Sequence, residues 1–162
     1  MRTSAMGNEE RIIMSYREIE FRGKIRNTGE WIHGAFIPAD YTYWREPSIA
    51  DNNHRFEIRP ETLGQYTGFK DKYGTKIYEG DILETLGDVL PVPYKKRMVV
   101  WWGPYCSKCY NDGESDFGFF MRHIPFRDFG DIWRRDFMYW VKFGVKVIGN
   151  MFDNPELLEE TK

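Results

Sequence analysis

The sequence has few of the features that mark several common classes of protein. Its 162 residues contain only two cysteines, too few for the disulfide framework that stabilises many small secreted domains. No apolar run approaches the length of a membrane span, and the first ten residues lack the apolar stretch of a signal peptide. We therefore expect a cytoplasmic protein with no membrane association.

The chain also lacks a large excess of either basic or acidic residues. The chain carries 23 basic and 25 acidic residues, for a formal net charge of −2 at pH 7. Because no third of the chain is strongly basic, the protein lacks the overall attraction to phosphate backbones that favours nucleic-acid binding. A local basic patch remains compatible with this composition.

The common catalytic motifs are missing as well. The sequence has no P-loop, no dinucleotide-binding glycine pattern and no Gly-x-Ser-x-Gly element. It names no nucleophile, general base or cofactor-binding residue, so we expect neither catalysis nor a bound cofactor.

Aromatic residues, by contrast, are abundant and make up 17% of the chain. Aromatic and β-branched side chains favour half-buried strands, so this composition favours β structure. Alternation and short apolar runs predict strands at 16–22, 31–37, 55–59, 82–86, 98–102, 117–121 and 145–152. Residues 38–54 contain two prolines and the run Asp51-Asn52-Asn53, and we expect a loop there.

The strongest local signal is a β-hairpin within residues 64–81. Asp71 is placed to accept backbone hydrogen bonds at the first position of a type I turn. Gly74 follows where a left-handed residue would complete the bulge of such a hairpin. A second sharp corner is predicted at Gly80.

Two helices are expected in the last third of the chain. Trp133, Phe137, Trp140 and Val141 have helical spacing, although a strand from Phe137 fits nearly as well. Residues 154–160 begin Asn-Pro-Glu, a capped helix start.

These elements predict one mainly β domain over residues 15–162. The glycine corners favour a sheet that closes into a small barrel, with a short helix at the C-terminal end. The polar residues 1–14 form a leader that is ordered, if at all, by packing on a neighbour.

Four segments are similar, in order, to proteins of the YopX family: 17–24, 29–37, 61–83 and 147–158. The resemblance covers Arg17 to Leu158. It implies a phage or prophage gene expressed in a bacterial host, and a fold built around an SH3-like β-barrel. It supplies no activity, because the family has no established catalytic residues. The leader, the cysteine pair and the aromatic-rich stretch at 131–143 depart from the family pattern.

A basic and aromatic face is one candidate site. Its aromatic ring could stack on the bases of a single strand of nucleic acid, and its basic side chains could neutralise the phosphates. The members of this face are Lys70, Lys72, Lys76, Tyr94, Lys95, Lys96 and Arg97. The alternative is that turn lysines are simply solvated and edge lysines block unwanted strand pairing.

An aromatic surface that binds a protein partner or another copy of the chain is the preferred candidate. We place it at Trp133, Phe137, Tyr139 and Trp140. Core packing is the alternative for all of these side chains.

The cysteine pair is a weaker candidate. Cys106 and Cys109 could hold zinc if His123 and a fourth ligand completed the set. Redox chemistry is disfavoured because no βαβ context surrounds the pair. We expect two thiols in a turn-rich loop and no metal.

Overall fold

The structure is a computed structural model that describes residues 18–40, 45–52, 54–86, 96–105, 116–124 and 137–159. Within this part the chain is mainly β, as predicted, with one short α-helix, α1 (Phe137–Phe143), and two 3-10 helices, η1 (Pro60–Thr62) and η2 (Pro155–Leu158). The strands are β1 (Phe21–Lys24), β2 (Trp31–Ile37), β3 (Ser48–Asp51), β4 (His54–Glu57), β5 (Gly64–Lys70), β6 (Lys76–Tyr78), β7 (Asp81–Thr85), β8 (Arg97–Tyr105), β9 (Asp116–His123) and β10 (Val145–Asn150).

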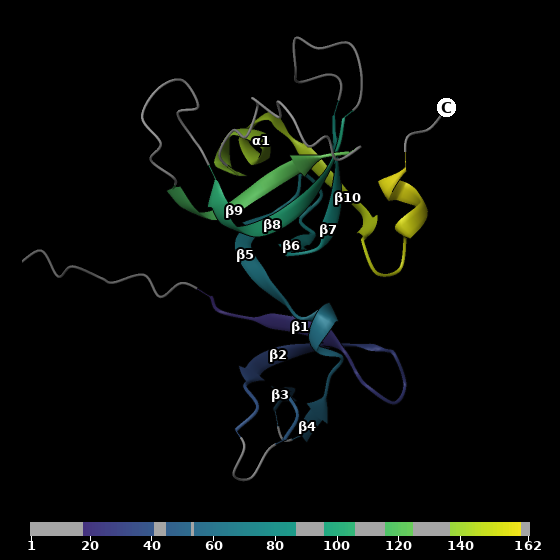
Figure 1. Cartoon of the computed structure of the whole chain (residues 1–162). Helices are drawn as coiled ribbons and strands as arrows, with labels where there is room; N and C mark the ends of the chain where they lie inside the picture. The colour runs from purple at the N-terminus through teal and green to yellow at the C-terminus, as the bar shows by residue number, and fades with distance from the viewer. Residues whose placement is uncertain are drawn as a thin grey trace, which may run out of the picture.

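The strands form two antiparallel sheets. One has the order β4-β3-β2-β1-β5-β6 and the other β10-β7-β8-β9. Strand β5 joins the two halves of the molecule in Figure 1: Gly64 and Gln65 pair with β1, whereas Tyr66 and Lys70 pair with β6.

Strand pairing among the described residues gives two separate sheets and no closed barrel, so the predicted SH3-like barrel is not confirmed. The loop predicted over 38–54 is wrong in part, because β3 lies within it. This strand has four residues and follows Pro47, so it shows too little alternation to be recognised. Ser48 and Ile49 are nevertheless both fully buried between β2 and β4.

The hairpin predicted at 64–81 is confirmed. Asp71 Oδ1 accepts hydrogen bonds from the backbone N–H groups of Tyr73 (2.8 Å) and Thr75 (2.9 Å). Gly74 has a φ of +88°, the left-handed conformation that the bulge requires. Asp71 Oδ2 also accepts from the N–H of Val147 (3.0 Å), so the turn is fastened to β10 as well as closed on itself.

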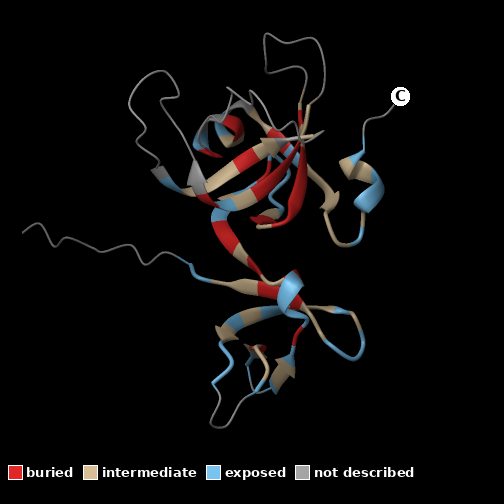
Figure 2. Cartoon of the chain, viewed as in Figure 1, coloured by how far each residue is buried: buried red, intermediate tan, exposed pale blue. Residues whose placement is uncertain are grey.

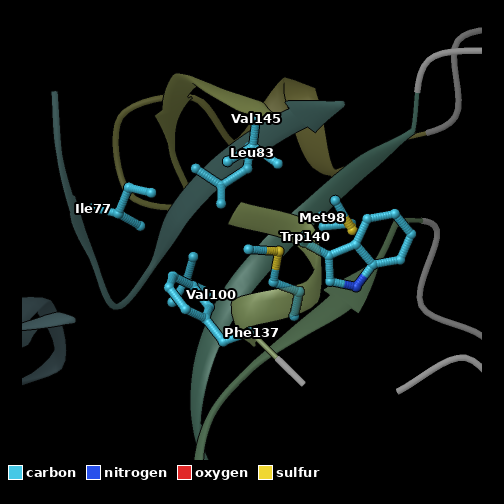
Figure 3. Close-up of a cluster of buried hydrophobic side chains, with 8 residues drawn as sticks. Ile77, Leu83, Met98, Val100, Phe137, Trp140 and Val145 are labelled. Carbon is cyan, nitrogen blue, oxygen red and sulfur yellow. The ribbon is translucent and has the colours of Figure 1, made fainter. Parts of the chain in front are cut away.

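The main core lies against one face of the four-stranded sheet. Figure 2 shows buried positions gathered on the strands of this sheet, on β5 and on α1. Figure 3 shows the side chains that meet there: Ile77, Leu83, Met98, Val100, Phe137, Trp140 and Val145. Helix α1 confirms the helical interpretation of the stripe from Phe137, although Trp133 is outside the described residues.

The predicted C-terminal helix is a 3-10 helix and not an α-helix. Pro155 occupies its first turn, as expected, but Asn154 makes no capping hydrogen bond. Its side-chain oxygen accepts instead from the N–H of Asn150 (3.2 Å) and so closes the turn that follows β10. In the described residues, no helix is long and apolar enough to cross a membrane. The leader, 1–14, lies outside them.

Candidate functional site

The predicted basic face is only partly assembled. Lys70 and Lys72 are exposed at the β5–β6 turn. Lys76, however, bonds to Glu18 (2.6 Å) and Glu20 (2.8 Å). The hydrogen bond that Lys76 donates to Glu18 makes the largest contribution to raising the pKa of Lys76, and the bond to Glu20 raises it further. The two carboxylates also offset the positive charge of Lys76. Lys76 is therefore unsuited to binding a phosphate.

Lys96 and Arg97 lie at the start of β8. The N–H of Lys96 donates to Thr85 Oγ1 (2.9 Å), which fixes the backbone beside β7. Arg97 Nη1 donates to the carbonyl of Leu157 (2.9 Å) and thereby ties η2 to this sheet. Arg97 therefore stabilises the packing of η2 against the four-stranded sheet. Two further predicted members of the face are outside the described residues, Tyr94 and Lys95.

Hydrogen bonds across β10 and β7 connect the lysines of the turn to Lys96. The N–H of Lys72 donates to the carbonyl of Val145 (3.1 Å), and Val145 pairs with Thr85. The N–H of Thr85 in turn donates to the carbonyl of Lys96 (2.9 Å). Three steps of about 4.8 Å place the backbones of Lys72 and Lys96 roughly 15 Å apart.

The structure adds two residues to this region that the sequence did not single out. Tyr73 is 67% exposed, and Lys146 Nζ lies 5.8 Å from the centre of its ring. We call Lys72, Tyr73 and Lys146 the hairpin face. The signal for Lys146 was missed because it comes from β10, whose pairing the local sequence does not reveal.

The predicted aromatic surface is wrong for two of its four residues. Phe137 is 4% exposed and Trp140 is 5% exposed, and both pack in the core. The stripe that α1 presents is therefore its inner face, which is the commonest role of an apolar helical stripe. Trp133 and the side chain of Tyr139 lie outside what the structure describes.

Exposed aromatic side chains are found instead on the hairpin of β8 and β9. Trp102 is 48% exposed and Phe117 is 69% exposed. Their rings meet edge to face at 6.2 Å, and Trp102 also contacts Phe119 at 4.7 Å. We call these three residues the aromatic tip.

Strand periodicity explains why the aromatic tip is exposed. Met98, Val100 and Trp102 alternate along β8, so all three side chains lie on the face that forms the core. Met98 and Val100 are buried there, and Phe119 still touches Phe137 of α1 at 6.3 Å. The core face thus continues past the helix that covers it, and the residues beyond are exposed.

A buried ion pair joins the two sheets. Arg22 Nη2 on β1 lies 2.6 Å from Asp81 Oδ1 on β7, and their side chains are 10% and 2% exposed. Arg22 also donates to the carbonyl of Glu79 (3.0 Å), and its guanidinium lies 4.8 Å from the ring centres of Trp31 and Tyr78. We call this arrangement the Arg22–Asp81 joint.

Burial raises the pKa of Asp81 to about 6, against the lowering effect of Arg22. A carboxyl group with such a pKa is a candidate acid or base. Its oxygens, however, accept from Arg22 and from the N–H of Tyr78 (2.8 Å), and no substrate atom reaches a side chain that is 2% exposed. The joint is therefore structural.

A second polar group extends the joint toward solvent. The hydroxyl of Tyr78 donates a hydrogen bond to Glu20. Burial is the main cause that raises the pKa of Tyr78, and this hydrogen bond is the second. The ring of His33 lies 5.4 Å from that of Tyr78, and burial lowers the pKa of this histidine. Together these contacts hold β1, β2 and β6 in a fixed arrangement.

The metal hypothesis falls mostly outside the described residues. Cys106 and Cys109 are not described, and His123 is placed only as the last residue of β9. The described part of the chain contains no cluster of three or more His, Cys, Asp or Glu that could hold a metal ion.

Comparison with known proteins gives a family and a distant structural likeness. No curated protein sequence matches the chain. It is similar to the crystal structure of protein EF1440 from Enterococcus faecalis, with 23% identity and a TM-score of 0.46, over 89% of this chain and 100% of the other. The family model described as YopX protein matches residues 8–159. The chain therefore belongs to the YopX family.

Proposed function

We propose that this protein is a non-catalytic accessory protein of a phage or prophage, and that its aromatic tip binds a protein in the cytoplasm of the bacterial host. The exposure of Trp102 and Phe117 carries the proposal. Adjacent exposed aromatic side chains are enriched where proteins dock, because they bury a large area at a small cost in side-chain entropy. The absence of catalytic motifs and the closed environment of Asp81 support a role in binding.

Site-specific photo-crosslinking in cells tests this function. We replace Phe117 with benzoylphenylalanine, which preserves the ring, and irradiate cells that express the variant. Ile19, which is 66% exposed near the start of the described chain, carries the same group in the control variant. We expect protein adducts from position 117 and few from position 19. Equal adducts at both positions, or none at 117, would contradict a docking role.

We also propose that the four-stranded sheet and the β5–β6 hairpin together form an SH3-like barrel. The hydrogen bonds from Lys72 to Val145 and from Val147 to Asp71 support this, because they bring the hairpin alongside β10. Hydrogen exchange at the Val147 amide tests it. We expect protection as strong as that of β7, whereas rapid exchange would contradict a closed arrangement.

The hairpin face supports a second candidate, a weak single-stranded nucleic-acid-binding module. Tyr73 offers an exposed ring for stacking, and Lys72 and Lys146 lie beside it. The backbone of Lys96 lies roughly 15 Å from that of Lys72. Fluorescence anisotropy with an oligo-dT probe tests it. We expect binding that weakens with salt and is lost in Lys72→Glu/Lys146→Glu.

A charge-matched control separates this face from net charge. Arg59→Glu/Lys142→Glu makes the same change in charge at two exposed basic residues outside the β5–β6 turn. Equal loss in both double variants, or no binding by the unmodified protein at low salt, would eliminate the hairpin face as a site.

A further inference from the structure

The four outer strands of the two sheets differ in how their edges are protected. The edge of β10 is covered by the β5–β6 turn, through Asp71 and the N–H of Lys72. Strand β6 has three residues, and β4 has four, three of which are His54, Arg55 and Glu57. Short and charged edges resist pairing with other chains.

Within the part of the chain that the structure describes, strand β9 has none of these protections. It is eight residues long, and no other described strand pairs with its outer edge. Between Asp116 and Arg122 its residues are Phe-Gly-Phe-Phe-Met, without a charge or a proline. An edge with this length and composition is suited to accept another strand by main-chain hydrogen bonding.

We infer that β9 is the contact between two copies of this chain, which pair their β9 strands in antiparallel fashion about a two-fold axis at Phe119. The inference rests on the proposed function, because it names the partner of the aromatic tip. The two four-stranded sheets then continue into one another. The contact is the same patch on both copies and closes on itself, as in most homodimers.

The order of residues along β9 selects this partner and this register. With the axis at Phe119, position 116 of one copy lies opposite position 122 of the other in the backbone register, and the sequence has an aspartate at the first position and an arginine at the second. Position 117 lies opposite 121, and 118 opposite 120. A two-fold axis at Phe120 would instead place Gly118 opposite Arg122 and lose both charge pairs.

The same register accounts for the exposed aromatic side chains. It places Phe117, 69% exposed, beside Met121 of the other copy, which is 1% exposed in its own core. Both residues lie on the core face of the sheet, since Phe117 and Met121 are four positions apart on a strand. Trp102 contacts Phe117 and Phe119, so it borders the new contact.

Disulfide trapping with two single-cysteine variants tests the register. Both carry Cys106→Ser and Cys109→Ser, and one adds Gly118→Cys whereas the other adds Phe120→Cys. Directly opposed residues on antiparallel strands have Cα atoms about 4.5–5.5 Å apart, which fits a disulfide bond. We expect a covalent dimer when the two variants are mixed and oxidised, and none from either variant alone. Phe119 stays intact, so the core contact with Phe137 is kept.

Charge exchange provides an independent measurement. Light scattering during size-exclusion chromatography should give twice the mass of one chain for the unmodified protein. Asp116→Lys should raise the dimer dissociation constant roughly tenfold or more, because each charge pair occurs twice and becomes repulsive. Asp116→Lys/Arg122→Glu restores opposite charges and should restore the dimer.

The outcomes separate this inference from the proposed function. A monomer at all micromolar concentrations, a covalent dimer from Phe120→Cys alone, or no trapping in the mixture would each overturn the β9 contact. If photo-crosslinking at position 117 then captures a different protein, the docking function stands without self-association. If it captures nothing, both fail.

Discussion

Replacement of Arg22 by methionine should destabilise the protein strongly. The substitution keeps an unbranched side chain between Trp31 and Tyr78 but leaves the carboxylate of Asp81 buried, at 2% exposure, without its cation. Removal of one partner of a buried ion pair costs about 3–5 kcal/mol. For a chain of this size, that cost corresponds to a fall in melting temperature of roughly 6–20 °C.

The cost should depend on pH in a defined direction. Asp81 has a pKa of about 6 in the folded protein, above its ordinary value of 3.8. Without Arg22 the folded pKa rises further, so at pH 7 the variant must either bury an unpaired charge or take up a proton. At pH 5 Asp81 is protonated in both proteins. The electrostatic part of the difference then disappears, and only the lost contacts of the guanidinium remain.

Urea unfolding followed by tryptophan fluorescence, at pH 5 and at pH 7.5, measures the effect. Arg26→Met is the matched control, because Arg26 pairs with Glu46 at the surface, where both side chains are about 40% exposed. Such a pair contributes about 0–1 kcal/mol. An effect of Arg22→Met no larger than that of Arg26→Met, or equal at both pH values, would refute the joint as a buried electrostatic link between the sheets.

Three further predictions concern the core, the β5–β6 turn and the titration of Asp81. Phe137→Ala should lower the free energy of unfolding by about 3–5 kcal/mol in urea titrations, because this ring is 4% exposed; a loss below about 1 kcal/mol would contradict its place in the core. Asp71→Ala should cost about 2–4 kcal/mol by the same measurement, since three backbone N–H groups lose their acceptor, and Asp71→Asn, which keeps one oxygen, should cost less. In the unmodified protein, Asp81 should make the free energy of unfolding fall as pH rises from about 4 to about 6, because the folded state holds its proton longer than the unfolded state; an identical pH profile for Asp81→Asn would rule this out.

Features of the fold could be predicted from the sequence where all the residues that determine them lie in one short segment. The turn at Asp71 and Gly74 needs a carboxylate and a left-handed residue three positions apart, and both requirements can be seen without coordinates. The strand at 31–37 was predicted with its final bounds, because its alternation and its closing proline lie together. Strand β3 was missed because its burial depends on partners on either side and not on its own pattern.

The candidate site was harder to predict because it depends on which elements cover one another. The stripe from Phe137 to Trp140 is apolar whether α1 faces outward or inward, and its burial follows from its contact with the four-stranded sheet. Conversely, Trp102 and Phe117 belong to strands that were predicted, but their exposure follows from where α1 ends above that sheet. The Arg22–Asp81 joint joins residues from different sheets, and nothing local marks them as partners.

The contacts of Asp153 set the order in which the fold can be completed during synthesis. Asp153 accepts from the indole N–H of Trp31 (2.7 Å), 122 positions earlier, and pairs with Lys24 on β1. Val147 reaches back 76 positions to Asp71 in the same way. Strands β1 and β2 therefore leave the ribosome long before Asp153 does. Their contacts with Asp153 can form only after almost the whole chain has been synthesised. Ribosome-bound chains that stop before Val145 should accordingly be far more sensitive to protease than the released protein.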